Sequence, residues 1–364
     1  MRAVWTITIM LAFPSIAFSQ IVNTATMDSS SYVVTGKVTV EGYVDTYYAY
    51  NFNERDTKDI PYFVSMSRHN EFNVNLAFVD VKYSSHSLRA RIVPGFGTYV
   101  NANYANEPAS LKNLIEANVG IRIFKDKGFW IDAGVLGSPY TNESAISKDH
   151  LAYTRSLAAE NVPYYLSGVK ATLPLSSKFN AYLFLLNGWQ QIADQNSNKS
   201  FGSQIELRPN NNLLITWNTY IGKERAAIDS VNGTRYFSDL YFIYKKAKLS
   251  MTGCVYYGIQ EHMDENLKWM QANIITRYRL SSVVSTTLRF EYFNDSKGVL
   301  IVPVVPAAEF KTSGASLGID FLIEDNVLLR TEARQLFSSN NIYLDRGRPA
   351  TSSFTLTASL CAWF

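Results

Sequence analysis

Serine, aspartate and histidine stand close together once in this sequence, at Ser147, Asp149 and His150. These are the residue types of a hydrolase in which a carboxylate orients a histidine and the histidine activates a serine hydroxyl. Neighbouring residues of one segment seldom form such a triad, because its members must approach one another from different directions. We therefore assign no catalytic residue and expect that the protein is not an enzyme.

Sequence patterns for metals and cofactors are missing as well. The chain has four histidines, none at metal-ligand spacing from another, and two cysteines that form no CxxC pair. It contains no glycine-rich phosphate loop. We expect neither a metal nor a cofactor.

Charged residues stand at every second position in several segments, with apolar residues between them. In a β-strand, residues two apart share a face. An Arg or Lys facing lipid at the membrane midplane would cost about 2–4 kcal/mol, so these rows indicate an aqueous interior. Charges on adjacent strands could instead pair along the wall and hold it open. The residues expected to line this interior, and any pore through it, are Glu41, Asp45, Arg89, Arg91, Glu116, Arg122, Arg289, Glu291, Arg330, Glu332 and Arg334.

The same alternation recurs along the whole chain in segments of the length that crosses a membrane as a strand. The last segment ends on the aromatic residue Phe364, as the closing strand of an outer-membrane barrel usually does. The sixteen candidate strands span 37–50, 70–83, 86–99, 111–124, 128–137, 163–173, 178–186, 200–207, 213–222, 234–244, 248–258, 266–278, 282–294, 309–321, 326–337 and 351–364.

Connections between these strands alternate between short turns and longer loops. Bacterial outer-membrane barrels show this asymmetry, with short periplasmic turns and long extracellular loops. The 23 Tyr, 21 Phe and 6 Trp are typical of aromatic girdles at the two membrane surfaces. The sequence therefore predicts an all-β fold, a transmembrane antiparallel β-barrel of about 16 strands. Cys254 and Cys361 fall on separate lumen-facing strands and are not expected to form a disulfide.

The chain begins with the features of an export signal. Arg2 is followed by an apolar run and by the small-x-small site Ala17-Phe18-Ser19. We expect a signal peptide at residues 1–19, a short periplasmic leader at 20–36 and one barrel domain at 37–364. The net charge of +3 is too balanced to indicate a nucleic-acid partner.

The third outer loop, residues 138–162, is the longest connection and is rich in polar residues. Long loops in compact domains are often functional, and in general porins a loop folds into the barrel and narrows it. By this analogy we expect the loop to constrict a pore, the alternative being a loop that only covers the surface. Its candidate constriction residues are Glu143, Lys148, Asp149 and Arg155.

Several blocks in the first half of the barrel sequence are similar to the OmpL-like β-barrel porins of Gram-negative bacteria. They include Gly42-Tyr43-Val44-Asp45, Arg89-Ala90-Arg91, Glu116-Ala117-Asn118-Val119-Gly120, the stretch from Glu143 through Leu157, and Asn187-Gly188-Trp189-Gln190. The second half resembles this family in architecture alone. The resemblance implies a diffusion channel in the outer membrane of a Gram-negative bacterium, and it supplies neither a substrate nor catalytic residues.

The function that fits these features is a porin with a water-filled channel for passive diffusion of small hydrophilic solutes. Two alternatives stay open, a barrel that acts as an adhesin or receptor and a hydrolase at the outer rim. Expected partners are the outer-membrane lipids and the barrel assembly machinery, which would bind the strand that ends at Phe364. Such porins are commonly homotrimers, and the lipid-facing residues fit a trimer and a monomer equally.

A further interpretation is that the protein is a channel for a specific solute. Tyr43, Tyr47, Tyr99 and Trp189 could form a stacking track for sugars. Aromatic girdle residues would explain the same four positions more simply.

Overall fold

The computed structural model describes residues 36–53, 57–124 and 128–364. The predicted signal peptide, and all of the predicted leader except Gly36, lie outside the described residues.

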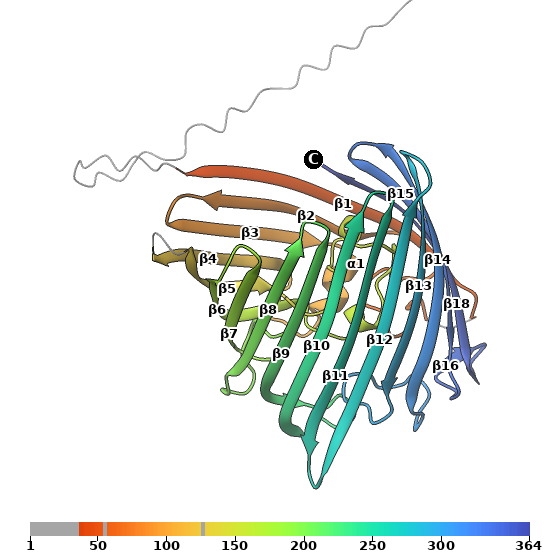
Figure 1. Ribbon diagram of the computed structural model, residues 1–364. Helices are drawn as coiled ribbons and strands as arrows, with labels where there is room; N and C mark the ends of the chain where they lie inside the picture. Colours follow the sequence, from red (N-terminus) through yellow and green to blue (C-terminus); the bar gives the residue numbers. More distant parts are fainter. Residues whose placement is uncertain (1–35, 54–56, 125–127) are drawn as a thin grey trace, which may run out of the picture. The chain divides into compact units, whose positions relative to one another are not determined.

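In the described part of the chain, sixteen antiparallel strands form a closed barrel (Figure 1). Each strand pairs with its neighbours in sequence, and the last strand pairs with the first. The count and order of strands expected from the sequence are therefore confirmed. The strands are β1 (Lys37–Asn51), β2 (Phe72–Ser84), β3 (Leu88–Phe96), β4 (Leu114–Phe124), β5 (Phe129–Gly137), β6 (Tyr165–Pro174), β7 (Phe179–Leu186), β8 (Ser200–Asn210), β9 (Leu213–Arg225), β10 (Asn232–Lys246), β11 (Leu249–His262), β12 (Glu265–Arg279), β13 (Val284–Asp295), β14 (Phe310–Glu324), β15 (Val327–Phe337) and β18 (Ser352–Trp363).

The remaining elements are short and lie in the connections at one end of the barrel. They are helix α1 (Thr98–Asn103), the 3-10 turn η1 (Ser147–Asp149), helix α2 (Leu157–Glu160), and the hairpin of β16 (Tyr343–Asp345) and β17 (Arg348–Ala350). None of the helices in the described ranges is long and apolar enough to cross a membrane.

The barrel closes where β1 meets β18. Their register pairs Tyr43 with Trp363 and Asn51 with Thr355. Beyond the last paired residue, the backbones of Gly42 and Phe364 exchange two hydrogen bonds of 2.7 and 3.0 Å. The carboxy-terminal residue is thus part of the seam.

Side chains alternate between the two faces of the wall, as the sequence pattern requires. On β14, Leu317 and Ile319 are 49% and 39% exposed and point outward, whereas Ser316 and Asp320 are 6% and 3% exposed and point inward. The outer face is accordingly apolar and suited to lipid. The polar and charged residues face the lumen.

Two predicted connections differ from the structure. The third strand ends at Phe96 instead of residue 99, because Gly97 takes a φ of 128° and helix α1 follows it. The connection between β11 and β12 is only residues 263–264, so the longer outer loop expected there is absent. The two strands extend to His262 and back to Glu265, and Gln260, Glu261 and His262 place polar residues on both faces, so the alternation can no longer be recognised there.

Candidate functional site

The connection between β5 and β6, residues 138–164 (loop 3), enters the barrel and lies buried within it. Ser147, Arg155, Ser156 and Leu157 are each no more than 1% exposed. A buried loop must find partners for its backbone groups. In this protein the partners come from the lumen-facing side chains of the wall.

The first part of loop 3 is bound to the wall formed by β9 to β12. The amide of Thr141 donates to the Asp239 carboxylate of β10 at 2.7 Å. Asn142 donates to Thr252 at 3.1 Å and to Asn273 at 3.0 Å, on β11 and β12. The loop therefore crosses the lumen along this wall.

The middle of loop 3 is held by charged residues of β13 and β15. Arg289 donates to the Thr154 carbonyl at 2.6 Å, and Glu332 accepts from the Thr154 amide at 2.7 Å. Arg330 donates to the Leu151 carbonyl at 2.8 Å and also to the Ser147 carbonyl. Hydrogen bonds that involve a charged group are roughly twice as strong as neutral ones, so these side chains act as anchors.

Two further residues of β15 and β13 hold the end of this stretch. Glu291 accepts from the Leu157 amide at 2.8 Å, and Arg334 donates to the Arg155 carbonyl at 3.0 Å. Arg334 and Glu291 also pair with each other at 2.6 Å.

Strand β1 holds the same loop from the other side of the closing seam. The hydroxyls of Tyr43 and Ser147 lie 2.7 Å apart, and the Tyr153 hydroxyl donates to Asp45 at 3.2 Å. Asp45 also accepts from Ser359 of β18 at 2.8 Å. Loop 3 is thus fixed to nearly the whole wall from β9 round to β1.

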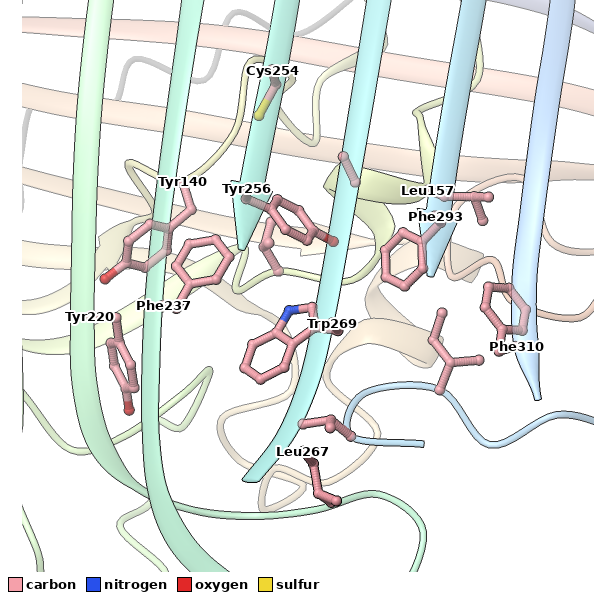
Figure 2. Packing of buried hydrophobic residues seen from close by; sticks show 14 of the residues in the cluster. Tyr140, Leu157, Tyr220, Phe237, Cys254, Tyr256, Leu267, Trp269, Phe293 and Phe310 are labelled. Carbon is pink, nitrogen blue, oxygen red and sulfur yellow. The ribbon is translucent and has the colours of Figure 1, made fainter. Parts of the chain in front are cut away.

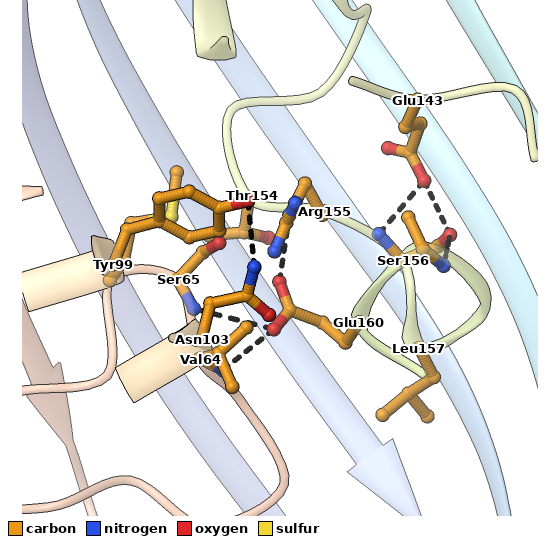
Figure 3. Close-up of polar contacts among 12 residues, drawn as sticks. Val64, Ser65, Tyr99, Asn103, Glu143, Thr154, Arg155, Ser156, Leu157 and Glu160 are labelled. Carbon is orange, nitrogen blue, oxygen red and sulfur yellow. Dashed lines mark hydrogen bonds and ion pairs between the residues drawn. The ribbon is translucent and has the colours of Figure 1, made fainter. Parts of the chain in front are cut away.

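A buried ion pair stabilises the turn of loop 3 back towards β6 (Figure 3). The Arg155 guanidinium donates to Glu160 at 2.9 Å and lies over the ring of Tyr164, 3.6 Å from its centroid. Burial is the largest single influence on the pKa of Arg155 and would lower it, but Glu160, Tyr164 and Tyr99 together outweigh burial and the pKa is raised. Glu160 also accepts from the amides of Val64 and Ser65, which ties the connection between β1 and β2 to loop 3.

Aromatic side chains fill the lumen beside β8 to β14 (Figure 2). The ring centroid of Tyr140, in loop 3, lies 5.4 Å from the ring centroid of Phe237 and 5.9 Å from that of Trp189. Phe237 in turn packs against Tyr256 at 5.1 Å. Loop 3 is therefore joined to this side of the barrel by apolar packing as well as by hydrogen bonds.

The charged residues predicted to line the lumen fall into two groups. Those covered by loop 3 are no more than 6% exposed, and they are Asp45, Arg289, Glu291, Arg330, Glu332 and Arg334. Those on β1, β3 and β4 are more accessible, and they are Glu41, Arg89, Arg91, Glu116 and Arg122. Glu41, Arg91 and Glu116 form ion pairs with adjacent strands, Arg89 reaches Asp132 two strands away on β5, and Arg122 contacts His86 in the turn between β2 and β3.

Pairing along the accessible wall involves carboxylates that the sequence analysis did not name. Arg91 binds Asp80 at 2.7 Å and Glu116 at 2.7 Å, and Arg89 binds Asp132 at 2.5 Å. Asp80 and Asp132, like Asp239 beneath loop 3, stand at lumen-facing positions of their strands. The alternation that identified the other charges could therefore have found them.

The four residues proposed for the constriction lie at different depths in loop 3. Glu143 and Arg155 are buried, at 6% and 1% exposure. The side chains of Lys148 and Asp149 are 29% and 46% exposed and pair with each other at 2.9 Å. Only this second pair meets solvent to any extent.

Ser147, Asp149 and His150 do not form a triad. The Nδ1 atom of His150 lies 2.8 Å from the Ala152 carbonyl, while Ser147 contacts Tyr43 and Asp149 contacts Lys148. Burial is the largest cause that lowers the pKa of His150 far below its ordinary value. Among the described residues, no group of His, Cys, Asp and Glu is suited to hold a metal ion, and both cysteines are free.

The four aromatic residues of the suggested sugar track are dispersed. Tyr43 contacts loop 3, Tyr47 bonds Thr98, and Trp189 belongs to the aromatic cluster of β8 to β14. Tyr99 instead lines a cavity of 190 Å³ between loop 3 and the wall of β2 to β5. Its polar lining includes Arg91, Glu116 and Glu143.

Solved structures with the same fold are outer-membrane channels and porins. The DcaP channel of Acinetobacter baumannii superposes with a TM-score of 0.62 at 10% identity, covering 90% of this chain and 97% of DcaP. The anion-selective porin of Comamonas acidovorans gives 0.59 at 13% identity, covering 90% and 100%. The trimer form of OmpT from Vibrio cholerae gives 0.59 at 10% identity, covering 90% and 99%.

These identities are low, so the similarity establishes the fold alone. No curated protein matches the sequence. A family model does match, over residues 37–364, which is the whole barrel. The chain therefore belongs to the family described as "Putative beta-barrel porin-2, OmpL-like", and it is a porin-like barrel of the bacterial outer membrane.

Proposed function

We propose that the protein is a porin of the Gram-negative outer membrane through which small hydrophilic solutes diffuse passively, with loop 3 as its constriction. Family membership supports the general class. A barrel of sixteen strands is wide enough to leave an aqueous lumen unless something fills it. Here loop 3 fills much of it.

The observation that carries the proposal is the uneven placement of loop 3. Its charged anchors on β13 and β15 are buried, whereas the side chains of Arg89 and Arg91 on β3 are 36% and 32% exposed. Lys170 on β6 is 27% exposed. Solutes would therefore pass along β2 to β6, between loop 3 and this wall.

Selection along this path would come from width and from fixed charge, without energy input. Arg89, Arg91 and Lys170 alternate with Asp132 and other carboxylates, so the wall carries both signs. Rows of charged side chains tune which solutes pass a pore.

The proposal extends to partners. The barrel assembly machinery would bind the strand that ends at Phe364, and lipid would surround the apolar outer face. A homotrimer is part of the proposal, and it is supported by the fold shared with OmpT, whose structure is a trimer form.

Single-channel conductance in a planar bilayer tests the function. The wild-type barrel should give ohmic steps, and a variant shortened within residues 142–160 should give larger ones. The matched control shortens residues 194–198, the exposed part of the connection between β7 and β8, and keeps Trp189 and Gln190, through which this connection contacts loop 3. Absence of steps from folded wild-type protein would reject a diffusion channel. Equal steps from both loop variants would reject loop 3 as the constriction.

A further inference from the structure

The cavity between loop 3 and the wall of β2 to β5 has an unusual combination of side chains. Its volume is 190 Å³, room for roughly six water molecules. Four tyrosines contribute to its lining, Tyr99, Tyr104, Tyr140 and Tyr164. The charged members of the lining are Glu116, Glu143 and a single cation, Arg91.

Glu143 has one carboxylate oxygen without a partner. Its Oε2 atom accepts from the amide of Ser156 at 2.9 Å and from the Ser156 hydroxyl. Its Oε1 atom is buried and meets no hydrogen-bond donor among the described residues (Figure 3). Glu143 as a whole is 6% exposed. Leaving such an oxygen unsatisfied is costly, so a donor that reached it would be bound favourably.

A second lining residue also has a polar atom without a hydrogen-bond partner. The hydroxyl of Tyr164 is buried and has no hydrogen-bond partner among the residues described. It can accept as well as donate a hydrogen bond.

The cations near the cavity are already neutralised. Arg91 lies between Asp80 and Glu116, at 2.7 Å from each. Burial raises the pKa of Glu143, and the charge of Arg289, which itself binds Glu332 at 2.5 Å, acts against this rise. Arg155, behind the tyrosines, binds Glu160 through its Nε atom, while its Nη1 and Nη2 atoms are buried and have no hydrogen-bond partner among the described residues. The lining therefore has an excess of carboxylate over available positive charge.

Tyrosine rings can bind a cation, and two of these rings already do so within the protein. The Arg155 guanidinium lies 3.6 Å from the ring centroid of Tyr164 and 5.1 Å from that of Tyr99. Ring faces attract ammonium and guanidinium groups, and aromatic cages recognise quaternary ammonium ligands in this way.

We propose that this cavity is a binding site for small organic cations that carry an ammonium group, with Glu143 opposite the charge and the tyrosines around it. The inference rests on the proposed function, because the cavity lies on the suggested path between loop 3 and the wall. It assigns that path a preferred solute class.

Choline is a suitable probe, since its quaternary ammonium group suits aromatic rings and its hydroxyl can donate a hydrogen bond. The experiment measures block of the potassium chloride current by choline in planar bilayers, and binding of choline to the detergent-solubilised barrel by calorimetry. Three variants are compared with the wild type. Glu143→Gln removes the charge but keeps an acceptor for Ser156, and Tyr164→Phe removes only a hydroxyl. Glu309→Gln is the matched control, an exposed carboxylate outside loop 3 that does not line the cavity.

Choline should bind the wild type and the Glu309→Gln control equally. Glu143→Gln should raise the dissociation constant about tenfold or more, because a charged partner is lost, and Tyr164→Phe should raise it less. Acetate should not compete.

The possible failures differ from one another. Wild-type steps that choline does not block, with no calorimetric binding, would overturn the cation site and leave the porin function standing. Binding that is the same in Glu143→Gln as in wild type would also overturn it. No steps at all from folded protein would instead reject the porin function on which the site rests. If Glu143→Gln does not fold, the Tyr164→Phe comparison and the choline measurements on wild type still test whether the cavity binds the cation.

Discussion

The ring of Phe364, the last residue of the chain, lies directly over the backbone of Gly42 in the first strand. A β-carbon on Gly42 would stand 2.3 Å from ring atom Cε2 of Phe364. Residue 42 therefore has to be small for the terminal ring to take its place in the seam.

Gly42→Ala should consequently lower the free energy of unfolding by about 1 kcal/mol, a modest value because an exposed terminal ring can turn away. The double variant Gly42→Ala/Phe364→Ala should lack this penalty relative to Phe364→Ala alone. Urea unfolding of the barrel in detergent measures both. Gly318→Ala is the control, since the nearest atom to its β-carbon would be 3.3 Å away. A penalty that persists without the ring would show that the contact with Phe364 is not its cause.

Arg330→Met should release loop 3. Arg330 binds Asp320 at 3.0 Å and the Leu151 carbonyl at 2.8 Å, so its loss leaves a buried carboxylate and loop carbonyls without a donor. Arg277 stays bound to Asp320 at 2.6 Å and limits the damage. We expect a loss of about 3 kcal/mol, the low end for a broken buried pair.

Thiol labelling measures the release of the loop. Cys361 is buried next to Tyr43, which holds Ser147 of loop 3, so a maleimide should react with Arg330→Met faster than with wild type. Arg208→Met, at an accessible position on β8, is the control. An unchanged labelling rate would argue against Arg330 as an anchor.

Gly97→Ala should be among the most damaging small substitutions in the barrel. Gly97 has φ 128° and ψ 178°, a region almost restricted to glycine, and a β-carbon there would stand 2.3 Å from the Asn75 carbonyl oxygen. Since neither backbone segment can yield easily, we expect a loss of about 3 kcal/mol. The test compares the urea concentration at the midpoint of unfolding for Gly97→Ala with that for Gly318→Ala. Similar midpoints would contradict the prediction.

Loop 3 should loosen as the pH falls below the ordinary histidine range. Burial, with the positive charges of Arg330, Arg155 and Arg289, lowers the pKa of His150 well below its usual value. Between the lowered pKa and the unfolded value of about 6.5, the unfolded or released state binds a proton that the packed state does not. Stability is therefore level above this window and falls as the pH decreases through it.

Hydrogen exchange of residues 147–155 at pH 7.5 and pH 5 checks the effect of His150. Exchange should speed up at the lower pH more than intrinsic chemistry explains. His150→Gln, which can still donate to the Ala152 carbonyl, should remove that excess. His262→Gln, in β11 outside loop 3, should leave it unchanged. An excess that survives His150→Gln would assign the pH response to another group.

The strands could be predicted from the sequence because each one carries its own alternation. Leu317, Ile319 and their polar neighbours on β14 show the pattern without reference to any other strand. The third loop could be singled out by its length and polarity. The residues that this loop contacts could not be predicted, since the partners of Thr141 and Thr154 lie about a hundred residues or more further along the chain.

The lining of the cavity can be predicted from the sequence only in part. Glu143, Arg91 and Glu116 were candidates from the sequence, but they were assigned to the loop and the wall as separate sets. Tyr104 and Tyr164 carried no signal, because tyrosine is common throughout this chain. Their convergence depends on where helix α1 and loop 3 come to lie, which follows from Gly97 and from the buried anchors.

Loop 3 also spans the closing seam from the inside. It is bonded to Tyr43 and Asp45 on β1 and to Arg330 and Glu332 on β15, and these strands flank β18 on its two sides. The same loop that narrows the lumen is therefore an internal brace, which holds the two neighbours of the closing strand at a fixed separation.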